Sequence, residues 1–153
     1  MSIEIEAATV ADGAACAGIL REAREHSLPY LPVLHTEQED VQFLTDRVFG
    51  TDTVLVAVDA ETRRIVGFIA FAEGWVDHLY VMPEVHRRGI GARLLDRAKL
   101  NQATLKLWTF QRNVGAIRFY ERHGFSVLRY TDGAGNEEKE PDVLLEWRTK
   151  PTL

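Results

Sequence analysis

Hydrophobic and polar residues follow two different periods over the first third of the chain. Residues 2–7 alternate isoleucine with glutamate, which predicts a short, half-buried strand. A capping-box pattern at 9–12 predicts the start of a helix, and a second one at 36–39 predicts a helix that continues to Val48. The prolines within 27–32 separate the two helices, because each biases the residue before it away from helix.

The remaining patterns are mostly those of strands. Two of them, 53–58 and 65–72, flank a polar turn and are expected to form a hairpin. The further expected elements are a strand over 75–81, a helix after Gly89, a strand over 105–110, a short helix through 116–120 that ends at Gly124, and strands over 125–130 and 143–147. The resulting order, β-α-α-β-β-β-α-β-α-β-β, predicts an α/β domain with a mixed sheet.

Composition places the chain among ordinary globular domains. Of its 153 residues, 46% are hydrophobic and 27% are charged, and this length predicts a single domain over 1–153. The longest apolar run, 65–72, is far shorter than the roughly 20 residues that cross a bilayer. Cys16 is the only cysteine, which fits a reducing compartment, and the acidic start of the chain argues against a signal peptide. We therefore expect a cytoplasmic protein without a membrane partner, and the net charge of −5 argues against nucleic acid as a partner.

The segment 79–92 carries the most informative chemistry. A strand pattern ends at Pro83, and a basic loop with two arginines and two glycines leads directly into a helix. Crowded backbone N–H groups and the positive end of a helix suit a phosphate. The P-loop and dinucleotide fingerprints are excluded, because other residues stand at their required glycine and lysine positions. On its own, such a loop is as typical of a bare tight turn as of an anion site.

Two stretches of the chain resemble one protein family. Leu79 to Leu95 resembles the acetyl-CoA-binding motif of the GNAT superfamily of N-acetyltransferases, in which a strand precedes Pro-x-x-Arg/Gln-x-x-Gly-x-Gly/Ala and a helix. Residues 113–125 resemble the family's Asn-x-x-Ala-x-x-Phe-Tyr-x-x-x-Gly-Phe. His86 departs from the first motif, which usually has arginine or glutamine there. The resemblance implies a mixed, mostly antiparallel central sheet flanked by helices, with splayed parallel strands that hold the cofactor.

The resemblance also implies where acetyl-CoA binds, in the gap between strands 75–81 and 105–110. The free strand edge there is expected to hydrogen-bond the pantetheine amides like an added strand, and a backbone N–H near Leu79 to stabilise the thioester oxygen. Backbone N–H groups of the glycine loop are expected to hold the pyrophosphate. The residues expected to bind the cofactor are Leu79, Val81, His86, Arg87, Arg88, Gly89, Ile90, Gly91, Ala92, Asn113 and Phe119.

Tyr120 is the residue to which the resemblance assigns a chemical role. In family members with tyrosine at this position, the phenol gives a proton or a hydrogen bond to the departing thiolate. The structural alternative is a core aromatic residue beside Phe119, because Phe-Tyr pairs often serve packing. The two motifs together favour the catalytic role.

The base that deprotonates the amine is left open among Asp77, Glu73, His78 and water. Asp77 is the first choice, because it shares strand parity with residues 79 and 81 unless a bulge intervenes. A solvated carboxylate near a strand end is the structural alternative. Trp108 stands where some protein-acetylating relatives carry a glutamate, which argues against that subgroup.

The function implied is direct transfer of an acetyl group from acetyl-CoA to a primary amine of a small molecule, peptide or protein. The alternatives are a non-catalytic acyl-CoA-binding module and an N-acyltransferase that uses a longer donor. Segments 27–36 and 131–142 are expected to set the acceptor, and the second holds five acidic residues against one lysine, which favours a cationic amine. The five histidines lack metal-ligand spacing, so no metal is expected. A homodimer is left open.

Overall fold

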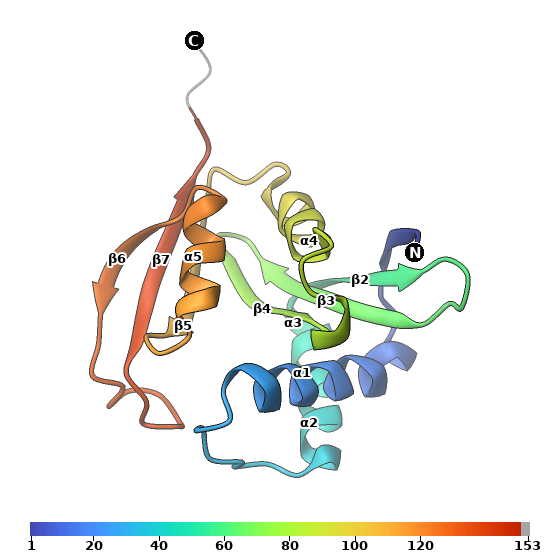
Figure 1. Cartoon of the computed structure of the whole chain (residues 1–153), viewed down its shortest axis with the longest axis horizontal. Coiled ribbons are helices and arrows are strands. Elements are labelled where there is room, and N and C mark those ends of the chain that lie inside the picture. Colours follow the sequence, from blue (N-terminus) through green and yellow to red (C-terminus); the bar gives the residue numbers. More distant parts are fainter. Residues whose placement is uncertain (151–153) are drawn as a thin grey trace.

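Seven strands form one sheet in the computed structural model, which describes residues 1–150 (Figure 1). The strands are β1 (Ile3–Ala7), β2 (Thr53–Asp59), β3 (Ile65–Ala72), β4 (Trp75–Val81), β5 (Thr104–Phe110), β6 (Ser126–Tyr130) and β7 (Asp142–Arg148). Their order across the sheet is β1-β2-β3-β4-β5-β7-β6, and every neighbouring pair is antiparallel except β4 and β5. The predicted mixed, mostly antiparallel sheet and the predicted order of elements are confirmed.

Helices and helical turns occupy the connections. They are η1 (Val10–Asp12), α1 (Gly13–Ser27), α2 (Glu37–Phe43), η2 (Leu44–Val48), α3 (Phe49–Thr51), η3 (Pro83–Val85), α4 (Ile90–Lys99) and α5 (Val114–Arg122). Both predicted capping boxes form, but the first one opens the 3-10 turn η1, and α1 begins only at Gly13. Within residues 1–150, every helix is too short or too polar to cross a lipid bilayer.

The helix predicted to run from 36 to 48 is divided in the structure. α2 ends at Phe43, and the chain continues as the π-helical segment η2. The Thr45 hydroxyl donates a hydrogen bond to the Val41 carbonyl at 2.9 Å, and back-bonding of this kind bends helices. A Cβ atom at Gly13 would clash with Thr45, so the glycine allows α1 and η2 to approach closely.

The centre of the sheet is buried on both faces. Phe68 and Ile69 are adjacent in β3, so their side chains point to opposite faces, and both are fully buried. Ile90 at the start of α4 packs on one face. Phe43 of α2 contacts His78 on the other, with ring centroids 5.9 Å apart. Helices on both sides therefore fix the position of β3 and β4, the strands beside the site.

The C-terminal strands form a second part of the sheet, with α5 lying over β5 and β7 (Figure 1). The side-chain amide of Gln111 donates to the carbonyls of Thr131 and Asp142, at 2.8 and 3.0 Å. It thereby ties the end of β5 to the ends of β6 and β7. β6 begins one residue later than predicted, because Phe125 is buried against Tyr120 instead of continuing the strand.

Candidate active site

β4 and β5 are parallel, but the two strands diverge beyond a single paired position. Within the described residues they pair at one position, Trp75 with Lys106, beside a hydrogen bond from the Lys106 N–H to the Gly74 carbonyl at 2.9 Å. Each strand stays paired on its other side, β4 with β3 up to Val81 and β5 with β7 along its length. The two strands therefore present facing edges across a gap (Figure 1).

The edge of β4 that faces the gap belongs to Leu79 and Val81. Met82 donates its N–H to the Val66 carbonyl of β3 at 2.8 Å. Tyr80, two residues earlier, is also paired with β3, so the backbone groups of both residues point toward β3. Backbone groups of a strand point alternately to its two sides. Those of Leu79 and Val81 therefore point away from β3, as a strand-like ligand requires.

The loop after β4 is shaped by unusual backbone conformations. Arg87 and Gly89 both adopt positive φ, 66° and 75°, and Gly89 is the left-handed N-cap of α4. His86 holds the loop against β4, because its Nε2 lies 2.9 Å from the Val81 carbonyl and donates to it. The Ile90 side chain is buried in the core. Only the backbone of this residue is available to a ligand.

One cleft of about 750 Å³ joins these features. Its walls come from β4, the loop, α4, β5, α5 and the C-terminal turn of α1. The predicted site residues that line it are Asp77, Leu79, Val81, His86, Arg87, Gly89, Ile90, Gly91, Ala92, Asn113, Phe119 and Tyr120. Arg88, which lies between the two residues of positive φ, is exposed and lies outside the lining. It is the one predicted cofactor-binding residue that the structure does not bring into the cleft.

Several cleft residues were not predicted. Arg24 comes from the C-terminal part of α1, and Arg118 and Arg122 come from α5. The two α5 arginines are four residues apart, so the helical period would have placed them on one face. Arg24 carried no such signal, since the contact between α1 and the cleft depends on the tertiary fold.

α5 meets α4 at a close contact beside the cleft. The Asn113 side chain caps α5 by accepting a hydrogen bond from the Ala116 N–H at 3.3 Å. A Cβ atom on Gly91 would lie 3.3 Å from the Phe119 ring, so a larger residue there would displace that ring. Tyr120 packs edge-to-face on Phe119, with centroids 5.3 Å apart, and is 9% exposed. Burial, and then the neighbouring Tyr80, raise the pKa of Tyr120 above its usual value, so its phenol keeps its proton throughout the neutral range.

A bulge in β4 decides the orientation of Asp77. The pairing with β3 passes from His78–Ala70 to Val76–Phe71, which leaves Asp77 as the extra residue. The parity argument that placed Asp77 beside residues 79 and 81 therefore does not apply, although Asp77 does line the cleft. Partial desolvation, a hydrogen bond to Asp52 and the Asp52 charge raise the pKa of Asp77 from 3.8 to about 6.

His78 lies next to this carboxyl with its ring largely buried. Its Nδ1 has no hydrogen-bond partner within the described residues. Burial lowers the pKa of His78 below its usual value, against the opposing effect of the Asp52 charge, so the imidazole is neutral at pH 7.

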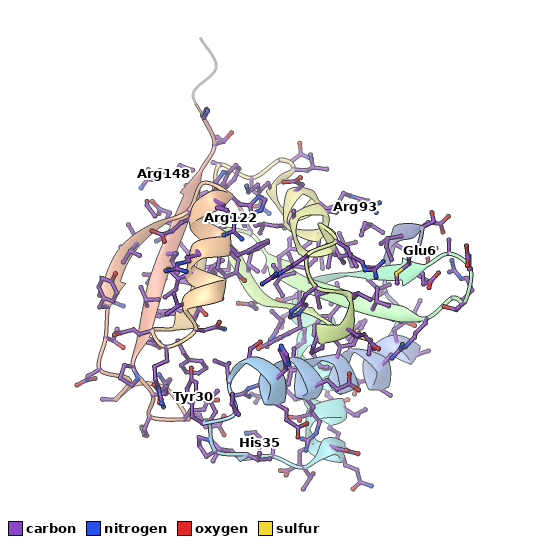
Figure 2. The ribbon with its side chains drawn as sticks, in the orientation of Figure 1. Glu6, Tyr30, His35, Arg93, Arg122 and Arg148 are labelled. Carbon is purple, nitrogen blue, oxygen red and sulfur yellow. The ribbon has the colours of Figure 1, made fainter. Side chains whose placement is uncertain are left out.

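Helix α1 and the segment after it are joined to the loop between β6 and β7. Arg24 of α1 forms an ion pair with Glu138 at 3.1 Å, and His35 Nε2 lies 2.6 Å from a carboxylate oxygen of Glu137. Figure 2 places Tyr30 and His35 beside that loop. The three glutamates of the acidic segment each have a partner, because Glu140 pairs with Arg112. Arg24 and Arg112 offset the charges of Glu138 and Glu140, which reduces the negative charge on which the predicted attraction of a cationic amine depends.

Arg112 connects the two segments further. Its guanidinium carbon lies 3.5 Å from the centre of the Tyr30 ring, while its nitrogen atoms contact the Glu140 carboxylate at 2.6 and 2.9 Å. Residues 27–36 and 131–142, the two segments expected to set the acceptor, are thus held against each other by these contacts. Within residues 1–150, no group of three or more His, Cys, Asp and Glu side chains is arranged to hold a metal ion.

A free strand edge that leads to a left-handed loop at a helix N-terminus suits an extended, phosphate-bearing ligand. A sequence profile described as "Acetyltransferase (GNAT) domain" matches residues 50–127, about half of the chain, and the chain therefore belongs to the GNAT acetyltransferase family. The resemblance seen in the two motifs is confirmed.

Individual relatives agree with this assignment. The chain is 32% identical over 95 residues to the peptidyl-lysine N-acetyltransferase YiaC of Escherichia coli K12, an alignment that covers 61% of this chain and 63% of YiaC. The chain thus spans less than two thirds of the length of the curated relatives it matches.

Solved structures share the fold at lower identity. PaiA N-acetyltransferase from Thermoplasma acidophilum, in complex with coenzyme A, matches with a TM-score of 0.76 at 20% identity, over 97% of this chain and 100% of that one. YncA from Salmonella typhimurium, with acetyl-CoA, matches with a TM-score of 0.72 at 19% identity, over 100% and 97%.

Proposed function

We propose that this protein transfers the acetyl group of acetyl-CoA directly to a primary amine. The observation that carries the proposal is the single cleft in which a free strand edge, a left-handed loop at a helix N-terminus, Tyr120 and Asp77 meet. The strand edge binds the pantetheine arm, and the loop binds the pyrophosphate. Tyr120 acts on the leaving thiolate, and Asp77 acts on the incoming amine.

Donor binding follows from the backbone. Leu79 and Val81 hydrogen-bond the pantetheine amides as an added strand would. The N–H groups at the start of α4 hold the pyrophosphate, which the positive end of the helix favours. Arg87, Arg118 and Arg122 line the same cleft and attract the phosphates of the donor. Phe119 packs against the arm where Asn113 positions it.

The transfer involves three proton transfers and replaces the C–S bond of the thioester with a C–N bond. The acceptor ammonium gives a proton to the Asp77 carboxylate, and the free amine attacks the thioester carbon. A backbone N–H near Leu79 stabilises the oxyanion. The C–S bond then breaks, Tyr120 protonates the thiolate, and the tyrosinate takes the remaining proton from the new amide nitrogen.

A direct transfer fits the single cysteine. Cys16 is fully buried, and burial, with the nearby Asp12, raises the pKa of its thiol to about 12. A thiol in this state is a poor nucleophile, so an acetyl-cysteine intermediate is disfavoured.

The acceptor approaches along residues 27–36, of which Ser27 and Leu28 line the cleft, and along 131–142, which contacts the lining residue Arg24 through Glu138. The relative YiaC is named a peptidyl-lysine N-acetyltransferase, so lysine-containing peptides are the first acceptors to test, followed by small-molecule amines.

The test is thiol release from acetyl-CoA in the presence of an acceptor panel, with mass detection of the acetylated amine. We expect release with at least one primary amine and slower release with longer acyl-CoA donors. Tight calorimetric binding of acetyl-CoA without turnover of any acceptor would identify a binding module instead. Faster turnover of a longer donor would change the donor assignment.

A further inference from the structure

Asp52 lies across the sheet from the bulge that carries Asp77. It follows α3 and directly precedes β2, and its N–H donates to the Val48 carbonyl at 2.9 Å. Thr53, the next residue, pairs with Phe71 of β3, and Phe71 pairs in turn with Val76 of β4. Asp52 and Asp77 are therefore the residues that flank these paired positions on either side of β3.

Asp77 is the extra residue of the bulge, and Asp52 is close enough to raise the pKa of its carboxyl. Both line a second cavity, of about 660 Å³, to which His78 also contributes. Asp77 and His78 are shared with the cofactor cleft, so the carboxyl pair stands where the two cavities meet. The Thr51 hydroxyl donates to Asp52 Oδ1 at 3.2 Å, which fixes the Asp52 carboxylate from the helix side.

The charges that face this pair come from three elements. Asp46 and Arg47 of η2 line the second cavity. His78 on β4 is neutral, and Arg24 of α1 acts on it from a distance while paired with Glu138. Arg47 is the only basic side chain lining the second cavity within the described residues. Asp46 and Arg47 carry opposite charges, so the raised pKa of Asp77 comes from partial desolvation and from Asp52.

We infer that Asp52 is a positioning residue for Asp77, an assignment that rests on the proposed acetyl transfer. When Asp77 takes the proton of the acceptor ammonium, its new O–H donates a hydrogen bond to the Asp52 carboxylate. The N–H bond of the ammonium breaks, the O–H bond of Asp77 forms, and no other bond changes. The proton leaves to solvent after transfer, and the pair returns to its ionised form.

The contact has a consequence for the pH dependence of the reaction. Asp77 must be ionised to accept a proton, so kcat/KM falls as pH drops through about 6. Replacing the Asp52 carboxylate with a neutral amide removes its charge and exchanges one acceptor oxygen for an N–H donor, and the acid inflection then moves toward 3.8, the ordinary value. Desolvation of Asp77 persists, so the inflection moves part of the way.

The experiment compares Asp52→Asn, Asp52→Glu and Asp77→Asn in full pH profiles of kcat and kcat/KM. Asp77→Asn lowers kcat by ~10²-fold or more, and Asp52→Asn by about tenfold, with the KM for acetyl-CoA unchanged in both. Asp52→Asn shifts the acid inflection downward, and Asp52→Glu restores it. Asp46→Asn is the matched control, because it removes a carboxylate of the same cavity and leaves the inflection in place.

A second readout does not depend on activity. In carbon NMR titrations of the apoprotein, the Asp77 carboxyl titrates near 6 in the wild type and lower in Asp52→Asn. An inflection that stays at its wild-type pH in Asp52→Asn, or a wild-type Asp77 that titrates at an ordinary value, overturns the pairing. A normal NMR result with no acetyl transfer to any amine overturns the proposed function and leaves the carboxyl pair without this role. Wild-type kcat in Asp77→Asn overturns the role of both aspartates.

Discussion

Backbone conformation shapes the cleft at the loop after β4, whereas ion pairs between side chains shape it at the end bordered by 27–36 and 131–142. In the loop, Gly89 and Arg87 adopt positive φ, and the ligand-facing groups are main-chain N–H groups. At the other end, Arg24, His35 and Arg112 hold three glutamates of a distant loop. In the proposed reaction, the fixed main-chain groups of the first end bind the donor, and the side chains of the second end contact the acceptor.

The largest effect is expected from the glycines of the loop. Valine at Gly89 would be forced to a φ near 75°, and valine at Gly91 would displace the Phe119 ring. Both variants are expected to lose measurable binding of acetyl-CoA by calorimetry and the associated rise in melting temperature.

A matched control is available in α1. Gly18 is exposed within a helix, and a Cβ atom there would meet no other atom within 4 Å. Gly18→Ala should keep acetyl-CoA binding and stabilise the protein by up to about 1 kcal/mol. Wild-type affinity in Gly91→Val would show that the close contact of α4 and α5 does not shape the cofactor site.

Tyr120→Phe is expected to lower kcat by on the order of 10²-fold while the Kd for acetyl-CoA stays nearly constant. The ring, and with it the packing on Phe119 and Phe125, is retained. Stopped-flow thiol detection and calorimetry measure the two quantities separately. An unchanged kcat would return Tyr120 to a purely structural role in the core.

The raised pKa of Asp77 predicts that removal of its carboxyl group lowers activity but raises the free energy of unfolding at neutral pH. Its folded pKa of about 6 lies above 3.8, so the folded state binds a proton more readily than the unfolded chain. Stability from this group is therefore present below pH 3.8 and is lost as pH rises through 6. Relative to wild type, Asp77→Asn should gain less than about 2 kcal/mol in urea unfolding at pH 7.5 and little at pH 4. An equal difference at both pH values would contradict the assignment.

The smallest effect belongs to the ion pairs at the acceptor end. Glu138→Gln removes the partner of Arg24, and both side chains are partly exposed, so we expect a loss of at most about 1 kcal/mol in stability. The KM for the acceptor should change, and that for acetyl-CoA should not. Glu25→Gln, an exposed carboxylate on the same helix as Arg24, is the control. Identical acceptor kinetics in both variants would mean that this bridge does not shape the acceptor site.

Local patterns predicted the parts of the molecule that depend on neighbours in sequence. Both capping boxes, the hairpin of β2 and β3, and the glycine loop each lie within a short window, and each formed. The two motifs predicted the family, which is confirmed, whereas the binding roles assigned to the cleft residues stay predictions.

The features that escaped prediction depend on residues far apart in the chain. The bulge at Asp77 arises from the register with β3, and its contact with Asp52 spans two strand pairings. Arg24 and Glu138 meet across more than a hundred residues. Periodicity carries no information on such contacts, which explains why the glycine loop between β4 and α4 was predicted, whereas the contacts of Arg24 and Asp52 were not.

The most direct test of the central claim uses acetyl-CoA labelled with carbon-13 in its acetyl carbonyl. With an amine acceptor identified in the panel, the account predicts that the label appears in the N-acetyl product in equal amount to the thiol released, and that Tyr120→Phe slows both together. Label that remains in acetyl-CoA, or that appears as free acetate, would contradict direct transfer to an amine.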